Sequence, residues 1–177
     1  MLAIASLLDP INDEQIKGLW RLLEEKCGLT GIQETPSPHF SWIGCEDMQL
    51  EKAHRRLEKI GKQIGPFKIK TAGLGIFPGR IPVLYISIVK TAELMKFHRL
   101  IWKELEKYLI VPTEYYRPDR WMPHITIAYG DLNPDNLACA LHDLAFEAQV
   151  YDIDVDNIAV MYHTEEGIGI KERFQLE

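Results

Sequence analysis

Residues 38–44 read PHFSWIG and residues 123–130 read PHITIAYG. Both segments have the order proline, histidine, apolar residue, hydroxyl residue, and then two apolar residues. They begin 85 residues apart in a chain of 177 residues, which is close to half of its length. A pattern repeated at this spacing indicates the internal duplication of one structural unit.

The histidine and the hydroxyl residue of each segment stand two positions apart: His39 with Ser41, and His124 with Thr126. Side chains at positions i and i+2 of a β-strand point to the same face of the strand. We therefore expect the duplication to bring both pairs to one cleft. Two imidazoles there can act as general acid and general base in one reaction, and two hydroxyls can hydrogen-bond the oxygens of a phosphate.

The motif residues could also serve a structural, metal-binding or nucleophilic role. A Pro-His pair kept for structure alone would leave the same pattern after a duplication. The chain has no H-E-x-x-H or C-x-x-C motif, and one imidazole plus one neutral hydroxyl per strand is a poor zinc ligand set. A serine nucleophile is disfavoured because a hydroxyl at i+2 lies about 6.5–7 Å along the strand from its histidine. The other histidines lack this context and are expected to be structural or surface residues: His54, His98, His142 and His163.

The order of predicted elements repeats as the motifs do. Hydrophobic periodicity and turn residues predict strand-helix-strand-helix-strand, then strand-helix-strand-helix-strand-strand. The predicted strands cover residues 2–8, 39–45, 67–71, 82–89, 123–130, 152–162 and 168–176, the last two joined near residues 166–167. The predicted helices cover residues 12–27, 47–64, 91–108 and 133–148, and residues 110–122 are predicted to be a polar loop.

This order predicts an α+β fold with antiparallel sheets and helices on their outer faces. We expect a single bilobal domain over residues 1–177, with repeats of about 1–80 and 81–177 that can exchange strands. The first helix is predicted to start within Asp9-Pro10 and the following residues 12–15, with Pro10 near its first turn and Asn12 and Gln15 as a pair that resembles a capping box.

Composition limits the classes of function. The net charge of −6 argues against a general nucleic-acid coat, although a local basic patch would suffice to recognise one RNA end. Arg80, Arg117 and Arg120 are candidates for that patch, unless they are ordinary surface charges. No apolar run approaches the roughly 20 residues of a membrane span. The three scattered cysteines predict free thiols in a reducing compartment, and hence a cytoplasmic protein without a disulfide.

The paired H-x-[S/T]-x segments, half a chain apart in a duplicated α+β protein, resemble the two-histidine (2H) phosphoesterase superfamily. The similarity extends over nearly the whole chain, and the 2′-5′ RNA ligase / cyclic phosphodiesterase branch is the most similar. The resemblance implies a bilobal fold with a pseudo-twofold cleft, in which His39 and His124 form the acid–base pair. It also implies that Ser41 and Thr126 hold phosphate oxygens, and that catalysis needs neither a metal nor another cofactor.

Two positions depart from the family pattern. Ser41 stands where threonine is commoner, and Tyr129 stands where ligase-like members often carry a basic residue. The Tyr129 phenol can donate a hydrogen bond to phosphate, or the residue can simply end the strand.

The resemblance implies a monomeric phosphodiesterase that hydrolyses 2′,3′-cyclic phosphate ends of RNA or related cyclic nucleotides, with reversible 2′-5′ ligation of RNA as a second activity. One alternative is an enzyme for small cyclic phosphates such as an ADP-ribose derivative. Another is a binding module for RNA ends or nucleotides without turnover. The sequence leaves open which histidine is the acid and which is the base.

Overall fold

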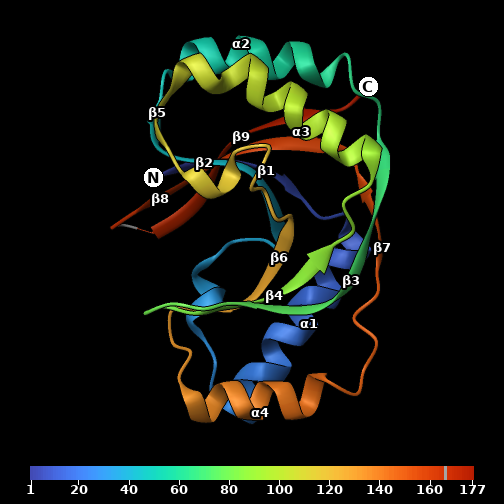
Figure 1. Cartoon of the computed structure of the whole chain (residues 1–177), viewed down its shortest axis with the longest axis vertical. Helices are drawn as coiled ribbons and strands as arrows, with labels where there is room; N and C mark the ends of the chain where they lie inside the picture. The colour runs from blue at the N-terminus through green and yellow to red at the C-terminus, as the bar shows by residue number, and fades with distance from the viewer. Residues whose placement is uncertain (166) are drawn as a thin grey trace.

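The computed structural model describes residues 1–165 and 167–177, and it consists of two antiparallel sheets with helices on their outer faces (Figure 1). The strands are β1 (Leu2–Leu7), β2 (His39–Met48), β3 (Phe67–Phe77), β4 (Val83–Ile88), β5 (Leu109–Pro112), β6 (His124–Tyr129), β7 (Asp152–Val155), β8 (Asn157–Thr164) and β9 (Gly167–Gln175). The helices are α1 (Pro10–Cys27), α2 (Leu50–Gly61), α3 (Ala92–Leu105) and α4 (Pro134–Leu144), with 3-10 turns η1 (Gly31–Glu34), η2 (Glu106–Tyr108) and η3 (Glu114–Tyr116). The predicted α+β fold with antiparallel pairing is confirmed.

The two sheets exchange strands between the halves of the chain. One sheet has the order β5-β2-β1-β8-β9, so the last two strands complete the sheet that contains the first His motif. The other has the order β6-β4-β3-β7, so a strand of the first half lies between strands of the second. Each histidine motif occupies the strand beside the first strand of its half: β2 pairs with β1, and β6 pairs with β4.

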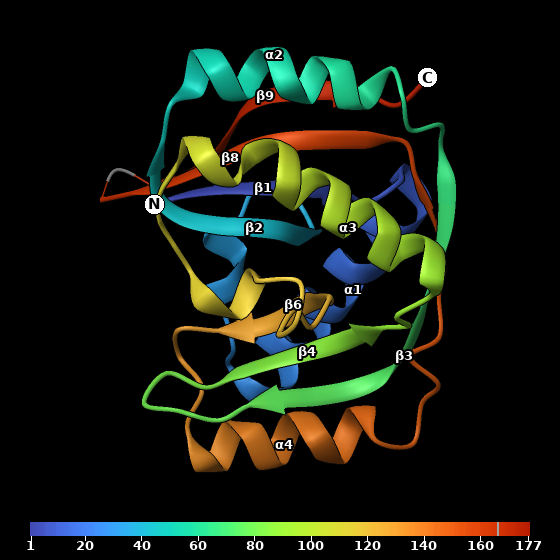
Figure 2. The same ribbon diagram turned by 45° about the horizontal axis from the view of Figure 1, so that its top comes forward.

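The helices are exchanged between the halves as the strands are: each sheet is covered by one helix from each half of the chain. Helices α2 and α3 cover the sheet of β1 and β2, whereas α1 and α4 lie with the sheet of β4 and β6 (Figure 2). The amphipathic pattern of each helix explains its buried face; in α2 this face is Ala53, Leu57 and Ile60. Trp20 of α1 donates from Nε1 to the backbone oxygen of Thr126 at 3.3 Å, which ties the first helix to the second His strand.

An aromatic stack fills the core behind the first His strand. The rings of His98 and Trp121 lie 3.9 Å apart and nearly parallel, and Trp42 stacks on Trp121 at 5.4 Å. Trp121 donates from Nε1 to the backbone oxygen of Ser41 at 2.9 Å. Burial lowers the pKa of His98 to about 4, so this histidine is neutral at physiological pH. Its structural role agrees with the expectation from the sequence.

Several predicted boundaries were wrong. Helix α1 begins at Pro10, because the Asp9 carboxylate accepts from the backbone N–H groups of Ile11 and Asn12; the predicted Asn12–Gln15 cap does not form the start. The predicted loop 110–122 contains part of β5 and all of η3. Strand β3 runs to Phe77, well beyond residue 71. The predicted helices 47–64, 91–108 and 133–148 are shorter in the structure, at residues 50–61, 92–105 and 134–144.

The predicted strand 152–162 is two strands in different sheets, β7 and β8. Asn157 marks the division. Its side chain donates to the backbone oxygen of Leu7 at 2.9 Å and accepts from the Leu7 N–H at 3.0 Å. These bonds hold the chain against β1, where β8 begins. The predicted junction at residues 166–167 includes Glu166, which lies outside the described residues.

The prediction of three free thiols was also wrong. Cys27 at the end of α1 and Cys139 in α4 form a disulfide across 112 residues of sequence, and only Cys45 is a free, buried thiol. The two helices pack against each other, so two cysteines without a recognisable sequence spacing meet. Among the described residues, no helix combines the length and the hydropathy needed to cross a bilayer.

Candidate active site

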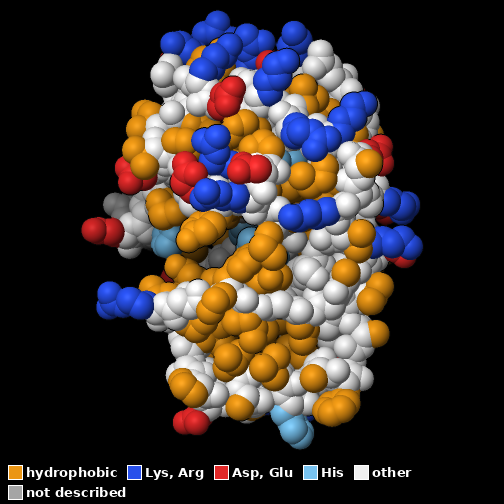
Figure 3. Space-filling model, in the orientation of Figure 1, with side chains coloured by type: hydrophobic (Ala, Val, Ile, Leu, Met, Phe, Trp, Pro, Cys, Tyr) orange, Lys and Arg blue, Asp and Glu red, His pale blue; other side chains and the backbone are white. Residues whose placement is uncertain are grey.

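The two motif histidines line one cleft between the sheets. His39 is the first residue of β2 and His124 is the first residue of β6, and both side chains are half-buried. The cleft has a volume of about 280 Å³, and its wall includes residues of both sheets. Figure 3 shows histidine side chains in a hollow between the upper and lower halves of the molecule. The polar groups of the wall and the glycine beside them include His39, Gly44, Tyr116, His124, Thr126, Tyr129 and His163, the last of which was expected to be a structural or surface residue.

Each histidine is held by the carbonyl group two residues before it. The Nδ1 atom of His39 lies 3.0 Å from the backbone oxygen of Ser37, and Nδ1 of His124 lies 2.7 Å from that of Met122. A carbonyl oxygen can only accept, so Nδ1 carries the proton in both rings. Nε2 of the neutral ring is then the basic atom, and it becomes a proton donor when the ring is protonated. The two imidazoles are thus prepared for the same chemistry.

The proline of each motif accounts for this arrangement. A proline disfavours the helical conformation of the residue before it and moves that residue to extended backbone. Pro38 therefore restricts Ser37, and Pro123 restricts Met122, which are the residues whose carbonyl groups accept from the imidazoles. The repeated Pro-His pair therefore places a backbone carbonyl group against Nδ1 of each imidazole, and this contact sets the orientation and the tautomer of the ring.

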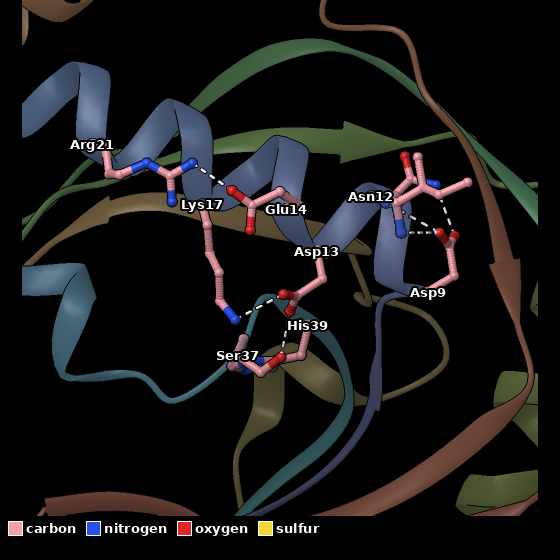
Figure 4. Close-up of polar contacts among 9 residues, drawn as sticks. Asp9, Asn12, Asp13, Glu14, Lys17, Arg21, Ser37 and His39 are labelled. Atoms are coloured by element: carbon pink, nitrogen blue, oxygen red, sulfur yellow. Dashed lines mark hydrogen bonds and ion pairs between the residues drawn. The ribbon is translucent and has the colours of Figure 1, made fainter.

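Helix α1 fixes the segment that precedes His39 (Figure 4). The Ser37 hydroxyl donates to the Asp13 carboxylate at 2.5 Å, and Lys17 pairs with the same carboxylate at 2.7 Å. The carbonyl that accepts from His39 therefore belongs to a residue anchored through its side chain.

His124 has an aromatic environment instead. Its ring centroid lies 4.9 Å from that of Phe77 and 5.1 Å from that of Tyr85, and these two rings stack on each other at 4.2 Å. The matched motifs therefore have unmatched surroundings. His39 has polar support from α1, and His124 packs against aromatic side chains of β3 and β4.

Burial sets the protonation of the pair. Desolvation lowers the pKa of His39 below its usual value, and the Ser37 carbonyl opposes this while the nearby His124 adds to it. Desolvation also lowers the pKa of His124, against the opposing effect of the Met122 carbonyl. Both rings are neutral at pH 7 in the free protein, and a bound anion would favour the charged form of one of them.

The hydroxyl groups of the two motifs occupy different positions. Thr126 lines the cleft, as the strand geometry predicted. Ser41 is absent from the cleft wall, and its side chain lies near enough to the Tyr116 phenol to oppose the rise in the pKa of that phenol. Tyr116 lines the cleft in its place, and burial raises the pKa of its phenol, so the group remains a proton donor. Tyr129 also lines the cleft, with 40% of its surface exposed.

Tyr116 was missed from the sequence because it lies in the segment predicted as a loop. Its position depends on Gly44 of β2: a Cβ atom at residue 44 would lie 2.7 Å from Cε2 of the Tyr116 ring. Gly44 closes the first motif, and this glycine was the one available signal that a side chain packs closely there.

The predicted basic residues do not line the cleft. Arg117 and Arg120 are exposed, and their guanidinium groups lie 3.8–4.0 Å from the carboxylates of Glu114 and Asp119. Arg80 is exposed in the connection between β3 and β4. Within residues 1–165 and 167–177, no three His, Cys, Asp or Glu side chains group closely enough to hold a metal ion.

A sequence model described as the 2′-5′ RNA ligase superfamily matches residues 9–167. The chain belongs to this superfamily. The 2′-5′ RNA ligase superfamily is a group of phosphoesterases, so its members act on phosphodiester bonds by hydrolysis or ligation. Membership therefore places the function of this chain in that class.

Solved structures agree with this assignment to the 2′-5′ RNA ligase superfamily. TT0787 of Thermus thermophilus superposes with a TM-score of 0.63 at 15% identity, covering 99% of this chain and 97% of that one. E. coli LigT complexed with 3′-AMP gives a TM-score of 0.62 at 15% identity, with the same coverage. LigT complexed with ATP gives 0.56 at 11% identity, covering 99% and 96%. These likenesses show the bilobal fold. No curated protein matches the chain in sequence.

Proposed function

We propose that this protein is a metal-independent phosphodiesterase that opens 2′,3′-cyclic phosphate ends of RNA or related cyclic nucleotides. The observation that supports the proposal is the matched pair of imidazoles: His39 and His124 line one cleft, and a backbone carbonyl occupies Nδ1 of each, which leaves Nε2 of both for proton transfer. A module that only bound nucleotides would not need two such groups. That E. coli LigT was crystallised with 3′-AMP is in keeping with a nucleotide in this cleft.

The proposed hydrolysis needs one neutral and one protonated histidine. Nε2 of the neutral ring takes a proton from water as the water oxygen forms a bond to phosphorus. The bond from phosphorus to one ribose oxygen breaks, and the protonated ring gives its proton to that oxygen. The product is a phosphate monoester. Thr126, Tyr116 and Tyr129 would donate hydrogen bonds to the phosphate oxygens. Ligation is the same ring opening with a 5′-hydroxyl group in place of water as the nucleophile, and its product is a phosphodiester.

An assay with a short RNA that ends in a 2′,3′-cyclic phosphate tests this proposal. We expect the purified protein to convert the cyclic end to a monoester, and to do so equally well after treatment with a chelator. Loss of activity in the chelator, restored by a divalent ion, would contradict the metal-independent mechanism. Turnover of a cyclic phosphate of ADP-ribose in preference to RNA would assign the enzyme to small substrates, and binding of RNA without turnover would make it a binding module.

The pH dependence of turnover should show the lowered pKa values. Catalysis needs one ring neutral and the other charged, so kcat/KM peaks between the two pKa values of the free protein. Burial lowers both below the usual value of about 6.5, so we expect the kcat/KM optimum below that pH. The bound phosphate anion stabilises an imidazolium, so the kcat optimum should lie at higher pH. Rate measurements from pH 4 to pH 9 check both statements. A kcat/KM optimum above pH 7 would contradict the first, and a kcat optimum at or below the kcat/KM optimum would contradict the second.

The two motif hydroxyls should differ in their effect on rate. Thr126 lines the cleft, so Thr126→Ala should lower kcat/KM by about 10- to 100-fold, which corresponds to the roughly 1.5–3 kcal/mol of a hydrogen bond to a charged group. Ser41 does not line the cleft, so Ser41→Ala should cost less. Thr126→Ser keeps the hydroxyl and serves as the control with near-normal activity. A larger loss for Ser41→Ala than for Thr126→Ala would show that the two hydroxyls act in the opposite order.

A further inference from the structure

A second groove lies at the outer face of α2, away from the catalytic cleft. It has a volume of about 460 Å³ and is lined by Lys52, Arg55, Arg56, Lys59 and Tyr108; we call it the basic groove. Four of its five side chains are cationic, and none of the described residues that line it is acidic. Figure 3 shows Lys and Arg side chains gathered at the end of the molecule where Figure 1 places α2.

The positive charge is concentrated around this groove although the protein as a whole is acidic. Residues 50–62 and 90–107, which contain α2 and α3, hold ten Lys or Arg and five Glu, whereas the whole chain has 20 Lys or Arg and 26 Asp or Glu. The rest of the chain is therefore strongly acidic. Such an asymmetry raises the local concentration of a polyanion at one end of the molecule.

The cations of the groove are only partly neutralised by the protein itself. Arg56 pairs with Glu104 at 3.3 Å, and Lys52 donates to the side-chain oxygen of Gln49 at 2.8 Å. Arg55 and Lys59 are exposed and form no ion pair with any described residue. These two side chains are available to an external anion.

The composition of the groove favours single-stranded nucleic acid over a membrane. Tyr108 supplies an aromatic ring beside the cations, and the ammonium group of Lys107 lies 5.1 Å from the centre of that ring. Cations combined with an aromatic surface are typical of single-strand binding sites. Insertion into a lipid surface uses exposed apolar side chains beside the cations, and α2 and α3, all of whose residues are described, expose no large hydrophobic side chain; the exposed Ile110 and Val111 belong to β5 instead.

Strands β2 and β5 connect the groove to the catalytic cleft. The backbone oxygen of Tyr108 accepts from the N–H of Gln49 at 2.9 Å, at the end of β2. Five residues earlier on the same strand, Gly44 lines the cleft and accepts from the N–H of Thr113, which follows β5. Five residues of strand span about 16 Å. At about 3.4 Å per stacked nucleotide, roughly five nucleotides cover this distance.

We propose that the basic groove binds the backbone phosphates of a single-stranded RNA whose 3′ end occupies the catalytic cleft. This inference rests on the proposed function, and it specifies the substrate class: an oligonucleotide of several residues rather than a mononucleotide. Each backbone phosphate that meets a cation of the groove releases counterions, so affinity should depend on RNA length and on salt.

The test compares Arg55→Gln/Lys59→Gln with Lys68→Gln/Lys70→Gln. The control removes the same charge from exposed lysines of β3, which pair with Asp154 and Asp152 in the other sheet. Fluorescence anisotropy measures the binding of a 12-nucleotide and a two-nucleotide RNA, each with a 3′-phosphate, from 50 mM to 500 mM salt. Turnover of a dinucleotide with a cyclic phosphate end is measured in parallel.

We expect the groove variant to bind the 12-nucleotide RNA roughly 25-fold more weakly at 0.1 M salt and to reduce the salt slope by about 1.4, from two lost phosphate contacts. Binding and turnover of the dinucleotide should not change, and the control should bind both RNAs like the wild type. Unchanged binding of the long RNA, equal weakening in the control, or preferential binding of phosphatidylserine vesicles would overturn the inference. If no cyclic phosphate is turned over but the binding results hold, the proposed function fails and the groove assignment stands.

Discussion

His39→Ala and His124→Ala are each expected to lower turnover of a 2′,3′-cyclic phosphate by about 10²–10⁴-fold, the usual contribution of one general acid or base. Each substitution removes one of the two imidazoles whose Nδ1 is held by a backbone carbonyl and whose Nε2 is left for proton transfer. Steady-state kinetics with a cyclic-phosphate RNA measure the effect.

The double variant should lose less than the product of the two single effects, because the two imidazoles act as one unit in proton transfer. The matched control is His142→Ala, which replaces an exposed histidine of α4 outside the cleft and should leave turnover unchanged. Activity within threefold of the wild type in both single variants would refute the acid–base pair.

Removal of the disulfide should have the second large effect, on stability. Cys27 and Cys139 close a loop of about 112 residues, and a cross-link of this span restricts the unfolded chain strongly. We expect Cys27→Ser/Cys139→Ser to lower the free energy of unfolding by about 4 kcal/mol, which is roughly a 10³-fold change in the folding equilibrium. Urea denaturation with linear extrapolation measures the difference.

Thiol counting provides the control for this prediction. Alkylation of the denatured, unreduced protein should modify one cysteine, and prior reduction should expose all three. Burial raises the pKa of the Cys45 thiol to about 11, so in the folded protein this group stays protonated and unreactive. Three modified cysteines without reduction would show that the bond does not form, and an unchanged urea midpoint in the double variant would refute its contribution.

The local parts of the fold could be predicted from the sequence because they depend on neighbouring residues. The apolar alternation of β6 and the helical spacing in α2 identify those elements without any tertiary information. The Pro-His repeat located both catalytic candidates, since strand geometry alone places His124 and Thr126 on one face. The family resemblance then supplied the bilobal arrangement, which periodicity cannot provide.

The parts that were missed depend on contacts between distant segments. Strand β5 is short and exists because it pairs with the end of β2. Tyr116 enters the cleft because Gly44 leaves room for its ring, 72 residues earlier in the chain. The disulfide depends on α1 packing beside α4, and the division between β7 and β8 depends on the bonds of Asn157 to β1. None of these has a signal within its own segment.

The exchange of strands between the sheets has a consequence for synthesis of the protein on the ribosome. Strand β1 can pair with β2 early, but its other edge waits for β8, where Leu2 lies opposite Tyr162. Until then that edge has unpaired backbone groups, which are a template for association with another chain. The sheet that carries His39 is therefore completed only when almost the whole chain has emerged, and a chain that stops before residue 157 should aggregate rather than retain partial activity.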